Sequence, residues 1–111
     1  MTPITERVWE ILQRRSGREN GIACFTLAAH ADATERDVRK AITELREAGV
    51  AVCGHPKDGY FIAATSAELE DTCRFLRCRA LHSLRLEAGM RKTTMLDLLG
   101  QLQFEFDQHL Y

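Results

Sequence analysis

The sequence has few of the residues that form linkers and no apolar run long enough to cross a membrane. Its 111 residues include two prolines and seven glycines. An uncharged stretch of about 18 residues, the length a transmembrane helix needs, does not occur. The first residues include Glu6 and Arg7 and do not form an apolar signal core. We therefore expect a globular chain of one domain with an appendage, located in the cytoplasm and without a membrane partner.

Cysteine is scarce and irregularly spaced. Cys24, Cys53, Cys73 and Cys78 are separated by 29, 20 and 5 positions. These spacings match neither a paired zinc pattern nor a dense disulfide framework. Cys53 and His55 could supply two ligands from one turn, but a closed zinc site needs four. The sequence predicts reduced thiols and no metal site.

Motifs for catalysis are also missing. The sequence contains no Gly-rich phosphate loop, no His-Glu helical zinc pattern, no Asp-rich calcium loop and no serine nucleophile elbow. Its histidines are scattered, and scattered histidines are seldom general bases. We predict that the chain is not an enzyme and needs no cofactor.

Neither sign of charge dominates. Fifteen Lys and Arg residues face sixteen Asp and Glu residues, which gives a net charge of −1. Any basic patch must therefore be local. Residues 1–62 are balanced, residues 63–92 carry six basic and four acidic groups, and residues 93–111 carry three acidic groups and no basic one.

Apolar residues at helical spacing predict three helices in the first half of the chain. The first covers residues 3–15. Residues 22–25 are predicted to be extended, and Thr26 is predicted to cap a short helix that follows. Thr34 caps a longer helix, which Gly49 ends in the left-handed conformation. The side chains predicted to fill the core are Val8, Ile11, Leu12, Leu27, Val38, Ile42 and Leu45.

A β-hairpin is predicted after these helices. Residues 50–53 and 60–63 favour strands, and the Gly- and Pro-containing residues 54–59 favour a turn-rich loop between them. The fold is therefore expected to be mainly α with a small β-hairpin. Two helices joined by a short break are in addition a helix-turn-helix candidate.

Two segments carry a resemblance to a known family. Val-Arg-Lys-Ala-Ile-Thr-Glu-Leu-Arg-Glu-Ala-Gly-Val at 38–50 and Gly-Tyr-Phe-Ile at 59–62 resemble winged helix-turn-helix domains of the biotin-repressor-like type, many of them encoded by bacteriophages and prophages. The resemblance covers about residues 4–65. It implies that the helix from Thr34 enters a DNA major groove while the hairpin, the wing, contacts phosphate or the minor groove. This wing departs from the family because His55 and Lys57 are its only possible cations and the acidic residue Asp58 follows Lys57 directly.

The resemblance and the charges together indicate a DNA-binding surface. Arginine pairs with guanine in a bidentate manner, and lysine pairs with phosphate. We expect a sequence-specific double-stranded DNA-binding protein, a transcriptional regulator of the phage or prophage type. The alternative, favoured by the near-zero net charge, is a winged-helix protein–protein module, such as an antirepressor or an inhibitor of a host enzyme, that does not bind DNA. The predicted DNA-binding residues are Thr34, Arg36, Arg39, Lys40, Thr43, Lys57, Arg74 and Arg77.

A C-terminal helical extension, residues 66–111, is predicted to follow the winged domain, residues 1–65. Helices are expected over 66–88 and 94–108, each after capping threonines. The arginines of the first of these helices could extend the phosphate contacts or pair with carboxylates on the same helix. Both helices carry more apolar residues than one packing partner requires, so we expect a homodimer; the alternative is a monomer with both helices folded back. The predicted interface residues are Leu76, Leu84, Met95, Leu98, Leu99, Leu102 and Phe106.

Overall fold

The chain folds as two compact units. The computed structural model describes residues 1–109; the first unit covers residues 1–73 and the second begins at Arg74. The first unit is mainly helical and contains one antiparallel two-stranded hairpin, which confirms the predicted fold class. Its elements are α1 (Pro3–Leu12), the 3-10 turn η1 (Arg18–Asn20), α2 (Cys24–His30), α3 (Glu35–Glu47), β1 (Val52–His55) and β2 (Gly59–Ile62).

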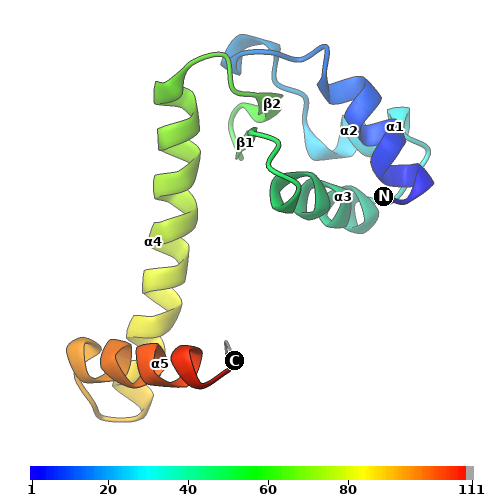
Figure 1. Cartoon of the computed structure of the whole chain (residues 1–111). Coiled ribbons are helices and arrows are strands. Elements are labelled where there is room, and N and C mark those ends of the chain that lie inside the picture. The colour runs from blue at the N-terminus through cyan, green and yellow to red at the C-terminus, as the bar shows by residue number, and fades with distance from the viewer. Residues whose placement is uncertain (110–111) are drawn as a thin grey trace. The chain divides into compact units, whose positions relative to one another are not determined.

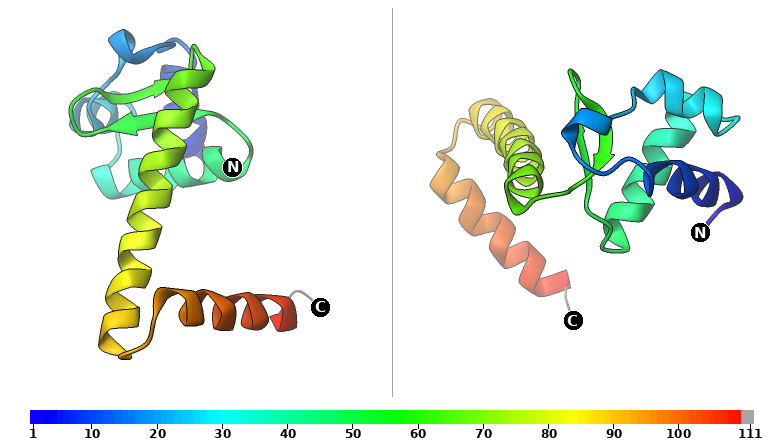
Figure 2. Two further views of the ribbon diagram at one scale, coloured as in Figure 1. Left: turned by 90° about the vertical axis from the view of Figure 1, so that its left-hand side faces the viewer. Right: turned by 90° about the horizontal axis from the view of Figure 1, so that it is seen from above.

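Three helices enclose the core of the first unit. α1, α2 and α3 contact one another, and the hairpin lies beside them and contacts α1 and α3 (Figure 1). The two strands run side by side along one side of the helical cluster (Figure 2). Of the predicted core residues only Ile11 is half-buried, and the others are buried. The buried residues of the cluster are Val8, Leu12, Ile22, Leu27, Ala28, Ala31, Val38, Ala41, Ile42, Leu45 and Val52.

Pairing with the second strand decides where α1 ends and α2 begins. α1 ends at Leu12 instead of residue 15, because Arg15 and Gly17 exchange backbone hydrogen bonds with Ile62 at 2.7 and 2.8 Å. Ile22 is extended as predicted and pairs with Tyr60 through two bonds of 2.8 Å. α2 then starts at once, so the predicted cap at Thr26 is wrong: Ala23 occupies that position without a side-chain hydrogen bond.

The hairpin is shifted from the predicted position. Val52 pairs with Ile62 and His55 pairs with Gly59, so the strands extend into the segment predicted as loop. The turn is reduced to residues 56–58. Gly59 has a φ of 75°, and a Cβ there would lie 2.9 Å from the Ala23 nitrogen and still closer to the Ile22 carbonyl. The close approach of the hairpin to Ile22 therefore requires glycine at this position.

Glu68 fastens the start of α4 (Ser66–Met90) to the first unit. Its backbone N–H donates to Thr65 Oγ1 at 3.2 Å, as the predicted cap requires. Its carboxylate accepts from the backbone nitrogens of Ala64 at 2.8 Å and Arg18 at 2.9 Å. The Arg18 guanidinium also donates to Asp71 at 3.1 Å. These contacts explain why the first turns of α4 belong to the first unit.

Replacing Glu68 by Gln should lower the melting temperature at neutral pH. It should also make the melting temperature of the variant fall less steeply with decreasing pH than that of the wild type. The bonds from Ala64 and Arg18 hold the pKa of the Glu68 carboxyl below its ordinary value of 4.5. A carboxyl group whose pKa is lower in the folded than in the unfolded chain stabilises the fold at every pH above its unfolded pKa. That stabilisation is lost as the pH falls through the folded pKa. Melting curves between pH 7 and pH 3 test this. Glu70→Gln, an exposed neighbour on α4, is the control, and equal behaviour of both variants contradicts the anchoring role.

The second unit contains the rest of α4 and α5 (Met95–His109), both close to their predicted bounds. The helices are separated by a turn in which Lys92 has a φ of 53°. Thr94 Oγ1 accepts from the Asp97 nitrogen at 3.1 Å and so caps α5. Among residues 1–109, none of the helices combines the length and apolar character that crossing a bilayer requires.

Candidate nucleic-acid interface

α3 separates an apolar face from a polar one. Val38, Ala41, Ile42 and Leu45 recur at three- and four-residue spacing and are all buried against α1 and α2. Thr34 caps the helix by accepting a hydrogen bond from the Asp37 nitrogen at 3.1 Å. The burial of one stripe forces the opposite stripe of long polar side chains toward solvent.

That exposed stripe brings four of the predicted DNA-binding residues together. Arg36, Arg39, Lys40 and Thr43 are exposed and border one shallow depression of about 450 Å³, together with Glu44 and Glu47. Within residues 1–109, no ion pair joins the three cations to a carboxylate. Their charges are therefore available to an external anion.

The charge of this face changes along the helix. Around the depression the N-terminal end carries Arg36, Arg39 and Lys40, whereas Glu44 and Glu47 border the C-terminal end. The first turn also contains Glu35 and Asp37, which do not border the depression, so cations outnumber carboxylates by three to two in this half. Glu44 is held in place, because its carboxylate accepts a 2.7 Å hydrogen bond from the Thr5 hydroxyl of α1. A phosphate backbone is attracted to the first half and repelled by the second, so the N-terminal half is the part suited to a nucleic acid.

The two predicted threonines have intrachain roles as well. Thr34 uses an oxygen lone pair for the cap of α3. Thr43 donates its hydroxyl proton to the Arg39 carbonyl at 3.1 Å, four residues back. Both side chains are exposed, and Thr34 retains a hydroxyl proton to donate while Thr43 retains lone pairs to accept.

Two titratable side chains, Tyr60 of β2 and Cys24 of α2, are affected by the charges of α3. Burial raises the pKa of the Tyr60 phenol, and the charges of Arg46 and Arg39 oppose that rise. Burial likewise raises the pKa of the Cys24 thiol, whose sulfur lies 3.9 Å from the Glu35 carbonyl oxygen. Arg46 Nε donates to the Val52 carbonyl at 2.9 Å and joins α3 to β1. Arg46 is therefore structural, whereas the Arg39 side chain is exposed on α3.

The hairpin turn presents one exposed lysine beside a neutralised carboxylate. Lys57 is exposed, and its backbone N–H donates to His55 Nδ1 at 3.1 Å. Asp58 lies 3.8 Å from Arg18 Nε and 3.9 Å from His55 Nδ1. The sequence gives no signal for the Arg18 contact, because 40 positions separate the partners. The contact reduces the negative charge that Asp58 would otherwise place next to Lys57.

The remaining predicted residues lie in the second unit. Arg74 and Arg77 occupy exposed positions on α4. Among the predicted interface residues, Leu76, Leu99 and Phe106 are exposed, while Leu84, Met95 and Leu102 are half-buried. Leu98 is only 2% exposed, so its side chain is already covered within the single chain, and its place in a partner interface stays a prediction.

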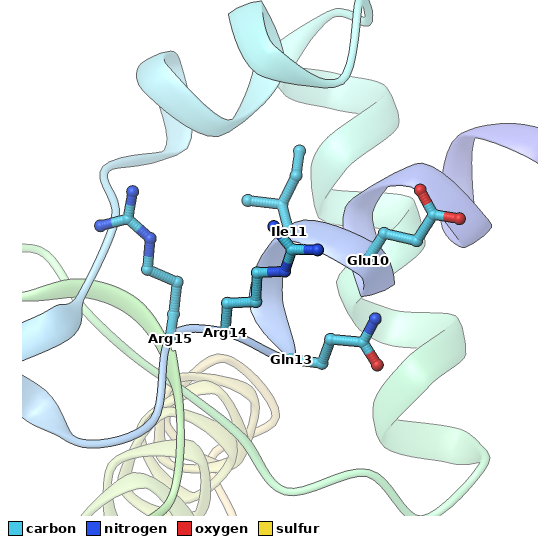
Figure 3. A pocket seen from close by; sticks show the side chains of 5 residues that line it. All are labelled: Glu10, Ile11, Gln13, Arg14 and Arg15. Carbon is cyan, nitrogen blue, oxygen red and sulfur yellow. The ribbon is translucent and has the colours of Figure 1, made fainter.

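The thiols and a second depression complete the set of candidates. All four cysteines are free; Cys53 is buried, and its burial raises the pKa of its thiol. Residues 1–109 contain no cluster of three or more His, Cys, Asp or Glu side chains able to hold a metal ion. A depression of about 650 Å³ at the end of α1, which the sequence did not single out, contains both signs of charge (Figure 3). It is bordered by Glu10, Ile11, Gln13, Arg14 and Arg15.

Comparison of the chain with protein-family models, curated proteins and solved structures gave no match.

Proposed function

We propose that this chain is a sequence-specific double-stranded DNA-binding protein, a transcriptional regulator of the phage or prophage type. The observation that carries the proposal is the group of exposed cations on the N-terminal half of α3, without carboxylate partners within residues 1–109. Other basic side chains of the first unit, such as Arg7, Arg18 and Arg46, are engaged by its own carbonyls or carboxylates. Three helices followed by a hairpin also suit a winged helix-turn-helix.

In the proposed mechanism some contacts position the protein on the duplex and others recognise the base sequence. Phosphate contacts fix the register of a protein on the duplex, and base-edge contacts specify sequence. Arg36 and Arg39 are suited to guanine edges in the major groove, and Lys40 is suited to phosphate. Thr34 and Thr43 add short-range hydrogen bonds. Glu44 and Glu47, at the other end of the depression, favour a position of the duplex backbone near Arg36, Arg39 and Lys40.

The hairpin adds a weaker phosphate contact through Lys57. The ion pair between Asp58 and Arg18 supports this role, because it lessens the repulsion that a lone carboxylate would exert on a phosphate. Arg74 and Arg77 are further phosphate contacts in this proposal. The proposed mechanism needs no cofactor or metal. A DNA-binding role also agrees with the expected location in the cytoplasm.

The salt dependence of binding tests the proposal against a protein–protein module. Fluorescence anisotropy with a random duplex pool and with duplexes selected from it should show binding that weakens steeply with salt. With about four phosphate contacts, affinity should fall roughly 100-fold between 50 and 200 mM salt. A protein–protein module that does not bind DNA would show no binding to either duplex at 50 mM salt. That result rejects the proposal.

Removing the Arg39 side chain should weaken binding to a selected duplex by about 1–3 kcal/mol and relax its preference at one base pair, because a bidentate arginine discriminates by that amount. Arg14→Ala, which removes an exposed arginine at the end of α1, is the matched control and should change affinity little. Melting curves of both variants verify the fold. Unchanged binding by Arg39→Ala rejects the assignment of the reading residue.

A further inference from the structure

The second unit leaves apolar faces on both of its helices uncovered. α5 leaves the end of α4 across its direction and does not run back along it (Figures 1 and 2). Within the described part of this unit only Ala88 and Leu98 are buried. Leu76, Leu86 and Met90 on α4 remain 40–86% exposed, and Leu96, Leu99 and Phe106 on α5 remain 40–80% exposed.

The two uncovered faces together expose a large apolar area. The exposed fractions of these six residues equal between three and four complete residues. At about 200 Å² for each large apolar residue, they present roughly 700 Å² to solvent in total. A standard protein interface covers about 800 Å² on each partner, so the uncovered area matches one half of such an interface.

Three of the exposed apolar residues of α4, Leu76, Leu86 and Met90, lie on one line along the helix. Leu76, Ser83 and Met90 recur every seven residues, with Arg79 and Leu86 between them, which is the spacing of a helix–helix seam. In the middle of this line a shallow depression of about 460 Å³ is bordered by Leu76, Arg79 and Ser83, among others. The small side chain of Ser83 leaves room there for a large apolar side chain of a partner.

The two helices of this unit carry opposite charges. From Arg74 to Lys92 the chain has six basic residues and one acidic residue, Glu87, which pairs with Arg91 at 2.7 Å. α5 has three acidic residues, Asp97, Glu105 and Asp107, and no Lys or Arg. Of these charges, Arg79 lies on the apolar line of α4 and Asp107 lies on the same side of α5 as Leu96. A two-fold rotation that packs the two apolar faces together can therefore bring opposite charges next to each other.

We propose that the occupant of these faces is a second copy of this chain, with α5 of each copy packed on α4 of the other. Two-fold symmetry then covers the six apolar residues on both copies and places each acidic α5 beside Arg79 of the partner, which lies on the same line of α4 as Leu76 and Met90. The proposal concerns the second unit alone, so it stands or fails separately from the DNA-binding role of α3.

Light scattering of the full chain at micromolar concentration should give twice the chain mass of 12.6 kDa. Leu86→Glu and Leu99→Glu should each shift the protein toward the monomer, because they place a charge in the apolar contact. Phe104→Ser is the matched control: Phe104 is exposed but lies on the opposite side of α5 from Phe106, so the mass should not change. A monomeric wild-type chain, or a dimer that both glutamates leave intact, overturns the proposal.

Charge reversal tests the exchange of α5 directly. One variant reverses the charge of α4 that lies on the contact line (Arg79→Glu), and the other reverses the acidic residue on the side of Leu96 on α5 (Asp107→Lys). Each alone should self-associate about tenfold more weakly or worse, because like charges then meet. An equimolar mixture should recover dimers, since each reversed helix meets a complementary one in the other variant. If the mixture stays as weakly associated as its components, the charges do not act between chains and the proposed arrangement is wrong.

Discussion

Leu45→Asp should unfold the first unit. Leu45 is 1% exposed and belongs to the buried cluster formed by the apolar face of α3 with α1 and α2. Deleting a buried leucine side chain alone costs about 2–5 kcal/mol. An unpaired carboxylate in its place adds a desolvation penalty, so the total approaches the entire stability of about 5–15 kcal/mol typical of a domain. Far-UV circular dichroism should show a loss of helix, and urea unfolding should show no native baseline.

Thr43→Asp is the control for this substitution. It places the same carboxylate on the same helix, but on the exposed face and next to Arg39 and Lys40. Its melting temperature should stay within a few degrees of the wild-type value, because surface substitutions usually change stability by about 0.5 kcal/mol or less. If Leu45→Asp melts like the wild type, the buried and exposed faces of α3 are reversed, and with them the candidate DNA-binding surface.

The faces of the helices could be predicted because they depend on local periodicity. Val38, Ala41, Ile42 and Leu45 recur at helical spacing, and any partner that covers them leaves Arg36, Arg39 and Lys40 exposed. The capping threonines act between residues three positions apart, so Thr34 and Thr65 could be assigned from sequence alone. The cationic part of the candidate interface follows from these local rules.

The ends of the elements depend on distant partners and could not be predicted in the same way. α1 stops early because Ile62 pairs with Arg15 and Gly17, and α2 starts early because Tyr60 pairs with Ile22. The contacts of Glu68 and Asp58 with Arg18 also join residues 40 or more positions apart. The apolar stripe that contains Leu98 indicates that its side chain is buried, but a stripe does not indicate whether the same chain or a partner covers it.

Gly59→Ala should destabilise the first unit much more than Gly49→Ala. Both glycines have positive φ, 75° and 92°, so alanine at either position costs about 1–2 kcal/mol in backbone strain. At Gly49 an added Cβ meets nothing within 4 Å. At Gly59 it meets the backbone of Ile22 and Ala23, which cannot move without breaking the two 2.8 Å bonds between Ile22 and Tyr60. These two bonds add about 1 kcal/mol each.

The difference in melting temperature between the two variants measures the effect of the contact with Ile22 and Ala23 apart from the backbone strain that both variants share. Gly49→Ala should lower the melting temperature by about 5–10 °C, and Gly59→Ala by about twice as much, since 1 kcal/mol corresponds to roughly 4–8 °C in a domain of this size. Amide hydrogen exchange should show faster exchange at Ile22 and Tyr60 in Gly59→Ala only. Equal shifts in both variants would mean that the hairpin moves freely against the chain before α2. In that case Ile22 does not fix the position of Lys57, and the hairpin cannot hold that lysine in a set place beside α3.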